Sequence, residues 1–393
     1  MEQPGRRPGS KLPPESRSLA PGPTRVHTGP EALDRLARQV ADEGDRVLVV
    51  SGPTSWGVAR DAVVGAFDRA GLALEVASYG EQITEAAIER LCVAARGMDA
   101  IVGVGGGRAL DAAKLVAHHL GLPAFTVPTS AATCAAWTAL SNLYSPAGGW
   151  LGGVTLDRGP AGAAISYALV ETAGPRLLAS GVADAMAKWY ESETAVDLAA
   201  ADALTAAAVE MAHHLHRQLV RHAAGAVADA RRGKSSDALR RVIDVNIALA
   251  GIVGGLGGSK CRSVAAHAVA NGLTHLPGNS ASFHGEKVAF GILVQLILLD
   301  RPLDEIEELI SFFADLDVPV TLAQLLGPDT SPDLAEAARI ALARDSGIHR
   351  LDVPLDSVAL VRAITEADAL GRRHLQARRL ERALSPIDLG QFA

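Results

Sequence analysis

A short glycine-rich stretch, GVGGGRALDAAK, carries the residue types with which a protein can hold a phosphate. Gly105, Gly106 and Gly107 would let the backbone approach a pyrophosphate closely, and the free amides of a following helix would stabilise its charge. Asp111 could brace the loop, and Lys114 could neutralise a phosphate. The pattern is not the GxGxxG fingerprint of the common dinucleotide-binding fold, and a glycine turn between a strand and a helix can also be purely structural.

The second half of the chain contains acidic residues and histidines, among them Asp184, His267 and His284, whose side chains can bind a metal. Taken singly, each residue has a plainer interpretation. Asp184 could pair with Lys188 four residues further on, and His267 could be a buried core histidine.

Helix and strand patterns alternate through the first third of the chain. The predicted strands are residues 47–50, 72–80, 99–107 and 122–128, and the predicted helices are residues 30–44, 58–71, 85–97 and 108–121. Short, aliphatic, β-branched runs closed by Gly and Pro are typical of buried strands. The alternation predicts a parallel α/β domain, in which the glycine-rich stretch joins a strand to the start of a helix.

After about residue 175 the pattern changes to long helices rich in Ala and Leu, and no strand pattern recurs. The predicted helices are residues 181–219, 238–256, 263–273, 286–298 and 357–374. The preceding residues 141–165 are rich in Gly, Ser and Pro, which predicts a loop or a hairpin. The second half of the chain should therefore be all helical.

Residues 1–25 contain basic residues but lack the apolar stretch of a signal peptide. Their Pro, Gly and Ser content predicts a disordered extension, which we exclude from the predicted fold. The rest of the chain divides into an α/β domain at residues 26–174 and an all-helical domain at residues 175–393.

The composition excludes several classes of protein. Of the 393 residues 48% are hydrophobic but only 4% aromatic, so Ala, Val, Leu and Ile must build most of the core. The formal net charge is −7, and the charges are spread along the chain, which argues against nucleic acid or a membrane as a partner. Three separated cysteines outside any CxxC pair indicate a reducing, cytoplasmic compartment. No apolar run reaches the roughly 18 residues of a membrane span.

Ordered motifs from about residue 27 to the end of the chain resemble the iron-containing alcohol dehydrogenase and glycerol dehydrogenase family. They are HTGPEALDRL, the GGG-x-x-x-D-x-x-K signature in GGGRALDAAK, VPTSAAT, LSNLY, PRLLASGVADAMAKWYES, AAHAVANGLTHLPG and FHGEKVAFG. The resemblance implies a dehydroquinate synthase-like fold, with an α/β dinucleotide-binding domain followed by an all-helical metal-binding, catalytic domain. It also implies a homo-oligomeric enzyme that transfers hydride between a small-molecule substrate and NAD or NADP.

The same resemblance groups the three residues with metal-binding side chains. Asp184, His267 and His284 match the family's metal ligands one for one, so they are expected to hold one zinc or iron ion and to carry catalysis. The ion would bind the alcohol oxygen, or polarise the carbonyl in the reverse direction. His267 would also contact the substrate.

The resemblance further implies a set of cofactor contacts. Gly107 and Arg108 would hold the pyrophosphate, and the cofactor cleft would also be lined by Thr129, Thr138, Leu140 and Tyr144. At the adenosine end, Ser51 and Gly52 stand where an Asp would accept hydrogen bonds from the ribose 2′-hydroxyl and repel a 2′-phosphate. Small residues there favour NADP over NAD, although such a turn can tolerate either cofactor.

The substrate segment ATCAAWTALS departs from glycerol dehydrogenases, which have an Asp where this chain has Cys134. A thiol is a poor acceptor for a glycerol hydroxyl. The CAAW stretch resembles a related branch that reduces 2-oxo acids to 2-hydroxy acids, in which Trp137 would form an apolar wall of the pocket. Trp137 could equally be a packing residue. We therefore expect a small 2-oxo acid, ketone or aldehyde as the substrate.

Three alternatives stay open at this point. The first is a glycerol or polyol dehydrogenase. The second is a cyclase like dehydroquinate synthase, which uses a Glu as first metal ligand and several substrate-phosphate lysines that we do not find in this chain. The third is a non-catalytic cofactor-binding protein, which would have no reason to keep a complete, open metal site.

Overall fold

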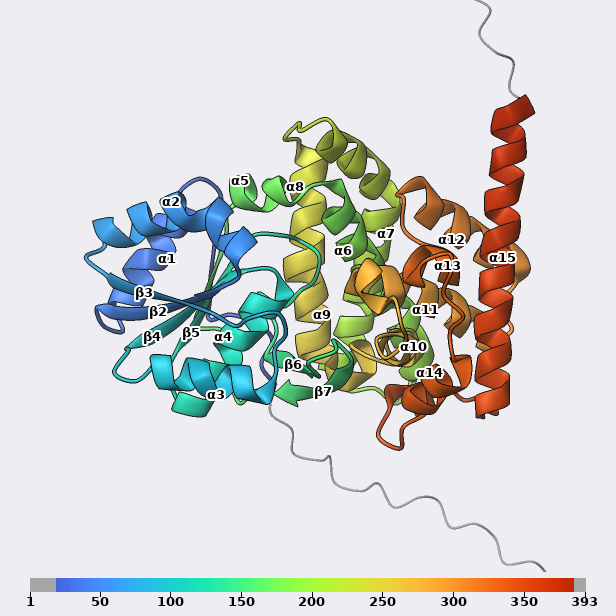
Figure 1. The fold of residues 1–393 in the computed structure, drawn as a ribbon, viewed down its shortest axis with the longest axis horizontal. Helices are drawn as coiled ribbons and strands as arrows, with labels where there is room; N and C mark the ends of the chain where they lie inside the picture. Colours follow the sequence, from blue (N-terminus) through green and yellow to red (C-terminus); the bar gives the residue numbers. More distant parts are fainter. Residues whose placement is uncertain (1–18, 385–393) are drawn as a thin grey trace, which may run out of the picture.

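The computed structural model describes residues 19–384 and shows two parts that lie side by side (Figure 1). An α/β part at the N-terminal end, blue to cyan, packs against a helical part, green to red. A long apolar helix made of α8 (Asp237–Asp244), a π-helical turn (Val245–Leu249) and α9 (Ala250–Gly257) stands at their junction. This arrangement confirms the predicted fold class of an α/β part followed by a helical one.

Six parallel strands form the sheet of the α/β part, in the order β1-β8-β5-β4-β2-β3. They are β1 (Arg25–Thr28), β8 (Gly162–Ile165), β5 (Ala124–Pro128), β4 (Ala100–Gly105), β2 (Arg46–Ser51) and β3 (Ala73–Ser78). The covering helices are α1 (Ala32–Ala41), α2 (Pro53–Arg69), α3 (Glu85–Ala94) and α4 (Gly107–Leu120). In β2, Val49 packs with α1 and α2, whereas Val50 packs with α3 and α4. Because both faces are covered, the strand is continuously apolar.

The strands and helices predicted between residues 30 and 128 are all present, with ends shifted by a few residues. Two strands, β1 and β8, were not predicted. Each has only four residues, RVHT and GAAI, and they pair with each other across more than a hundred positions, Arg25 opposite Gly162. The expected loop or hairpin at residues 141–165 contains an antiparallel hairpin, β6 (Leu140–Tyr144) and β7 (Trp150–Thr155), before it reaches β8.

The N-terminal segment joins the fold earlier than expected. Residues 1–18 of the predicted disordered extension lie outside the described residues. Residues 19–24 pack on the body, because the indole Nε1 of Trp137 donates to the carbonyl of Pro21 at 3.0 Å and the Thr24 amide donates to the carbonyl of Pro160 at 3.1 Å. The structure therefore adds residues 19–25 to the folded part.

The helical part is built around α6, α10 and α11, where α11 packs against both α6 and α10 and all three contribute to the core. Its helices are α6 (Pro175–Ala195), α7 (Ala203–Arg231), α10 (Ala265–Leu273), α11 (His284–Leu298), α12 (Leu303–Asp315), α13 (Leu322–Leu326), α14 (Leu334–Ala341) and α15 (Ser357–Leu384); a short helix, α5 (Tyr167–Val170), leads into it. The predicted continuous helix over residues 181–219 is wrong. It ends at Ala195, and α7 starts anew because the Asp202 carboxylate caps it by accepting the amides of Leu204 and Thr205.

One helix of the described part, Asp237–Cys261, is long and apolar enough to cross a membrane by length and composition. More than half of its apolar window is buried inside the protein, where it packs along α7. Its glycines allow close approach: a Cβ on Gly251 would lie 2.5 Å from the Trp137 side chain, and one on Gly254 would lie 2.6 Å from the Arg262 side chain. These features are those of a core helix that brings the two parts of the chain together.

Candidate active site

A cleft of about 1000 Å³ lies where the carboxyl ends of β2, β4 and β5 meet the helical part. Its lining includes Gly52 after β2, Gly106 after β4 and Thr129 after β5, and on the other side Asp184 of α6 and His267 of α10. In open α/β sheets, ligands bind outside the carboxyl ends of the strands. The cleft therefore brings the glycine-rich stretch and the metal-binding side chains of the sequence into one site.

The candidate metal ligands converge from three helices. Asp184 lies on α6, His267 on α10, and His284 is the first residue of α11; one ligand atom of each lies within 4.8 Å of the others. The Oδ1 atom of Asp184 is 3.4 Å from Nε2 of both histidines. This oxygen is buried and makes no hydrogen bond within residues 19–384. A buried carboxylate oxygen facing two imidazole nitrogens is a donor set that a divalent cation would satisfy.

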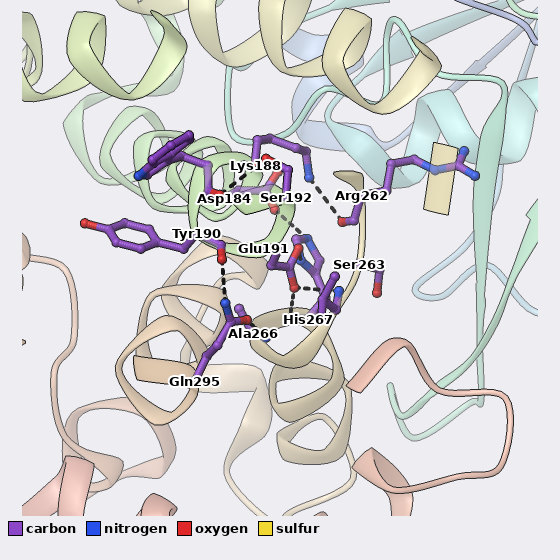
Figure 2. A network of polar contacts seen from close by, with 12 residues as sticks. Asp184, Lys188, Tyr190, Glu191, Ser192, Arg262, Ser263, Ala266, His267 and Gln295 are labelled. Carbon is purple, nitrogen blue, oxygen red and sulfur yellow. Dashed lines mark hydrogen bonds and ion pairs between the residues drawn. The ribbon is translucent and has the colours of Figure 1, made fainter. Parts of the chain in front are cut away.

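Glu191, which the sequence reasoning missed, orients one of these imidazoles (Figure 2). Its Oε2 atom lies 2.8 Å from Nδ1 of His267, and its Oε1 atom accepts the backbone amides of Val264 and His267 at 2.8 and 3.0 Å. The carboxylate therefore holds Nδ1 of the ring and leaves Nε2 directed at Asp184. A signal was available, since Glu191 follows Asp184 by two helical turns and so shares its face of α6.

The charges of this cluster are set by their mutual contacts. Burial by itself raises the pKa of the Asp184 carboxyl, but the adjacent rings of His267 and His284 outweigh it and hold that pKa below its usual range. Burial also acts to raise the pKa of Glu191, and the charge of His267 reverses the shift. For His267 burial lowers the pKa, whereas the Glu191 carboxylate raises it to about 9. Both carboxylates are therefore ionised at neutral pH and can offset the charge of a bound cation.

The alternative in which Asp184 pairs with Lys188 does not hold. Among the residues that the structure describes, Asp184 contacts His267 and His284 and forms no ion pair with Lys188. The Lys188 ammonium instead donates to the backbone carbonyl of Arg262 at 3.3 Å (Figure 2). The four-residue spacing permits an ion pair on a helix, but the side chains point to different partners.

The glycine-rich stretch forms the expected turn at the start of α4. Gly106 is the residue before the helix and Gly107 its first residue, and both line the cleft. Gly105 does not line it. Its φ of +150° and the Cβ position only 2.8 Å from Ala109 and 2.9 Å from Ser55 make it a turn residue that admits no side chain. The first turn of α4 can thus present backbone amides to an anion.

The expected phosphate contact of Lys114 is wrong. Lys114 is 2% exposed and lies behind the cleft, where its ammonium donates to the carbonyls of Thr138 and Leu140 and pairs with Asp111 at 3.0 Å. The other oxygen of Asp111 accepts the backbone amide of Asn142 at 3.1 Å. Asp111 and Lys114 therefore fasten the β6–β7 hairpin to α4, as a brace would; Asp111 also lines the cleft, whereas Lys114 does not.

At the expected adenosine end, Ser51 and Gly52 differ in their access to the cleft. Ser51 is buried, and its hydroxyl donates to the carbonyl of Val104 at 2.7 Å, so it does not line the cleft. Gly52 lines it, together with the uncharged residues Pro53, Thr54 and Ser55 of α2. Since these neighbours bear no acidic group, nothing in this turn repels a 2′-phosphate.

The remaining expected cofactor contacts all line the cleft: Arg108, Thr129, Thr138, Leu140 and Tyr144.

Of the two expected substrate residues, only one lines the cleft. Cys134 lines the cleft, and burial raises the pKa of its thiol, which is therefore neutral at pH 7. Trp137 lies outside it, with its indole against Gly251 and its Nε1 bound to the carbonyl of Pro21. The expected pocket wall at Trp137 is thus wrong, and its role is to join the N-terminal segment to α9.

Further residues of the cleft were not singled out as site residues from the sequence. They include Ser130, Thr133, Asn142, Lys188, Arg262, Asn271, Thr274 and Lys287. Asn271 lies one helical turn after His267, and that spacing places it on the same face of α10. Arg262 and Thr274 lie in turns, for which the sequence periodicity gives no direction.

Comparison with known proteins finds close similarity over most of the chain. Residues 23–155 match the family model described as iron-containing alcohol dehydrogenase. The chain is 40% identical to an uncharacterized oxidoreductase of Synechocystis, over 92% of this chain and 94% of that protein. It is 34% identical to a glycerol dehydrogenase of Escherichia coli, over 90% of this chain and 97% of that protein. It is also 35% identical to Escherichia coli hydroxycarboxylate dehydrogenase A, over 68% of this chain and 75% of that protein.

The fold is shared as well. The crystal structure of a probable glycerol dehydrogenase from Sinorhizobium meliloti superposes with a TM-score of 0.81 at 30% sequence identity, covering 91% of this chain and 99% of that one. The similarity thus extends from the sheet through the helices that carry Asp184, His267 and His284.

Proposed function

This chain belongs to the iron-containing alcohol dehydrogenase family, and on that premise we propose that it interconverts a small 2-oxo acid, ketone or aldehyde and the corresponding alcohol. It is an oxidoreductase that acts on CH–OH groups. The observation that carries the proposal is the convergence of Asp184, His267 and His284 on the cleft into which the glycine turn opens. A metal centre and a nucleotide cleft in one cavity suit hydride transfer.

The donor set fits one divalent ion, because the buried Oδ1 atom of Asp184 lacks a hydrogen bond within residues 19–384 and faces two imidazoles. Asp184, His267 and His284 would hold the ion, either zinc or iron, since carboxylate and imidazole suit both. When bound, the ion would supply Lewis acidity to the substrate oxygen, and NAD(P)H would supply the hydride. Glu191 would keep the ring of His267 in the orientation that this requires.

For the cofactor we propose NADP(H) in preference to NAD(H). The support is the uncharged lining around Gly52 at the end of β2, where an acidic residue would repel a 2′-phosphate. Gly106, Gly107 and Arg108 would hold the pyrophosphate at the start of α4.

A 2-oxo acid is the substrate class that we favour. Cys134, a neutral thiol on the cleft, offers no carboxylate for a polyol hydroxyl. The 35% identity to a hydroxycarboxylate dehydrogenase is consistent with this choice. Glycerol or another polyol is the second candidate, because several relatives are glycerol dehydrogenases. A cyclase reaction has less support, since the first ligand is Asp184 and these relatives are oxidoreductases.

The test is a substrate panel with the purified, metal-loaded protein. Reduction of 2-oxo acids, ketones and aldehydes, and oxidation of glycerol and other polyols, would each be measured with NADPH and NADH. We expect the highest kcat/KM for a 2-oxo acid with NADPH. A glycerol kcat/KM above that of every carbonyl compound would replace this proposal with the polyol alternative.

We also propose a cellular compartment, an oligomeric state and a class of partner for the enzyme. The described part of the chain contains three free cysteines and no disulfide, which suits the cytoplasm. We propose a homo-oligomer that acts on a small-molecule substrate, with neither nucleic acid nor a membrane as a partner. Sedimentation of the purified protein would test the assembly.

A further inference from the structure

Lys188 carries a buried ammonium group that forms no direct ion pair within residues 19–384, although the Asp184 and Glu191 carboxylates of the same helix act on it electrostatically. The residue is 3% exposed, and its Nζ atom makes one hydrogen bond in this part of the chain, at 3.3 Å to the carbonyl oxygen of Arg262. An ammonium group offers three donors. Burying donors without acceptors costs free energy, and the carboxylate of a ligand would supply the acceptors that this ammonium group lacks.

The ammonium lies on the cleft beside the candidate metal centre. Lys188 and Asp184 both line the cleft, and they occupy successive turns of α6, about 6 Å apart along the helix axis. The Arg262 guanidinium is also on the cleft but points away from Asp184 (Figure 2). Lys188 is therefore the cation placed to meet a group that adjoins the reacting carbon of a substrate.

Two other cations of the cleft already have acceptors. The Arg108 guanidinium donates to a backbone carbonyl at 2.8 Å. The Lys287 ammonium donates to the carbonyls of Asn279 and Ser282, each at 2.7 Å. The hydrogen bond of Lys188, at 3.3 Å, is longer than those of Arg108 and Lys287. Lys188 can therefore bind a ligand without first breaking a short hydrogen bond.

Cys134 leaves the charge of Lys188 available. The thiol lies on the cleft, and Lys188 and Asp184 both act on it electrostatically. Because the thiol is neutral, Cys134 adds no counter-charge to those of Asp184 and Glu191. A carboxylate at position 134 would offset the attraction of Lys188 for a ligand anion.

We propose that Lys188 binds the carboxylate of the substrate and thereby determines a preference for 2-oxo acids over neutral ketones. The inference rests on the proposed function and specifies the residue behind its substrate class. In a 2-oxo acid the carboxylate is bonded to the carbonyl carbon, so an ammonium one helical turn from Asp184 can hold the carboxylate while the carbonyl oxygen faces the metal ligands. The chain as a whole has a net charge of −7, so the attraction for an anion is local to this site.

The test compares Lys188→Met and Lys188→Arg with the wild type on two substrates, pyruvate and its neutral analogue hydroxyacetone. We expect Lys188→Met to lower kcat/KM for pyruvate about 10- to 100-fold, the effect of losing one charge-assisted hydrogen bond. The value for hydroxyacetone should change less than about threefold by the same reasoning. Lys188→Arg, which keeps the charge, should retain part of the preference.

A binding measurement separates this inference from the proposed function. Oxamate, an unreactive carboxylate of similar shape, is titrated calorimetrically into the metal-loaded protein, with metal content and thermal unfolding as controls for a native site. Weaker oxamate binding in Lys188→Met supports the inference even if pyruvate is a poor substrate, an outcome that would count against the proposed function alone. Unchanged oxamate binding, or an equal loss of kcat/KM for both substrates, would overturn the role of Lys188 as the carboxylate-binding residue.

Discussion

The Nδ1 atom of His267 lies 2.8 Å from Oε2 of Glu191, while the other oxygen of that carboxylate accepts the backbone amides of Val264 and His267. One side chain of α6 therefore fixes both the start of α10 and the ring that α10 contributes to the site. This geometry makes Glu191 a positioning residue for His267 in the candidate metal site.

We predict that Glu191→Gln weakens metal binding about 10- to 100-fold, because the amide loses the charge that holds the imidazole. The measurement is metal competition against a chromogenic chelator. Glu193→Gln is the matched control. It removes another carboxylate of α6, one that pairs with Arg301 and not with His267. Equal metal affinity in wild type and Glu191→Gln would contradict the positioning role.

Removing the metal, or the Asp184 carboxylate, should abolish turnover and leave the fold largely intact. The second half of the chain has an extensive apolar core of its own, and this core does not depend on one ion. Chelated wild type and Asp184→Ala would be assayed for turnover and for thermal unfolding, with Asp197→Ala as a carboxylate control outside the cleft. Full activity in metal-free protein would refute the metal-dependent mechanism.

Gly52→Asp should weaken NADPH binding more than NADH binding, since the new carboxylate would lie on the cleft near a 2′-phosphate. The backbone of Gly52 permits a side chain, since φ is −94° and the residue precedes the first turn of α2, but a Cβ would lie 3.1 Å from the Tyr79 hydroxyl, which must shift slightly to admit it. Gly52→Asn controls for size. Fluorescence titration gives both dissociation constants, and a wild type that binds NADH tenfold more tightly, about 1.4 kcal/mol, would reverse the cofactor assignment.

Ser51→Asp, in contrast, is expected to destabilise the protein. The Ser51 hydroxyl is buried and bonded to the carbonyl of Val104, so a carboxylate there would lose water and face an acceptor. A fall in the unfolding temperature, with no selective change in cofactor affinity, is the expected outcome of a thermal melt. Selective loss of NADPH binding at unchanged stability would show that Ser51 faces the nucleotide.

Cys134→Asp should raise glycerol oxidation and lower 2-oxo acid reduction. A carboxylate accepts a polyol hydroxyl, and it would also repel a substrate carboxylate and offset the charge of Lys188. The measurement is kcat/KM for both substrates, compared as differences in transition-state stabilisation. Cys134→Ser adds a hydroxyl without charge and is the control. If Cys134→Asp scales both substrates equally, Cys134 is a packing residue.

Lys114→Met should cost stability rather than nucleotide affinity. It leaves the buried Asp111 carboxylate without its cation and frees the carbonyls of Thr138 and Leu140. Removing one partner of a buried ion pair lowers the free energy of unfolding by about 3–5 kcal/mol. Urea unfolding measures this loss, and a weaker NADPH affinity at unchanged stability would restore the phosphate-binding role.

Elements with a local periodicity could be predicted from the amino-acid sequence. The run Val47–Val50 is apolar at every position because β2 is covered on both faces, and the alternation around it predicts the parallel sheet. The convergence of Asp184, His267 and His284 could be predicted because their surrounding motifs resemble those of a known family. The strands β1 and β8 could not, since four residues carry little periodicity and each is stabilised by the other.

The partners of the polar side chains, in contrast, could be identified only in the folded structure. A four-residue spacing made Asp184 and Lys188 a possible pair, yet Asp184 faces the histidines and Lys188 faces a turn more than seventy positions away. Trp137 lies outside the cleft because its indole packs against Gly251 of α9 and donates to the carbonyl of Pro21. The physical reason is the same in both cases: a helix fixes which face a side chain occupies, but burial and hydrogen bonding with distant segments choose the partner that it meets there.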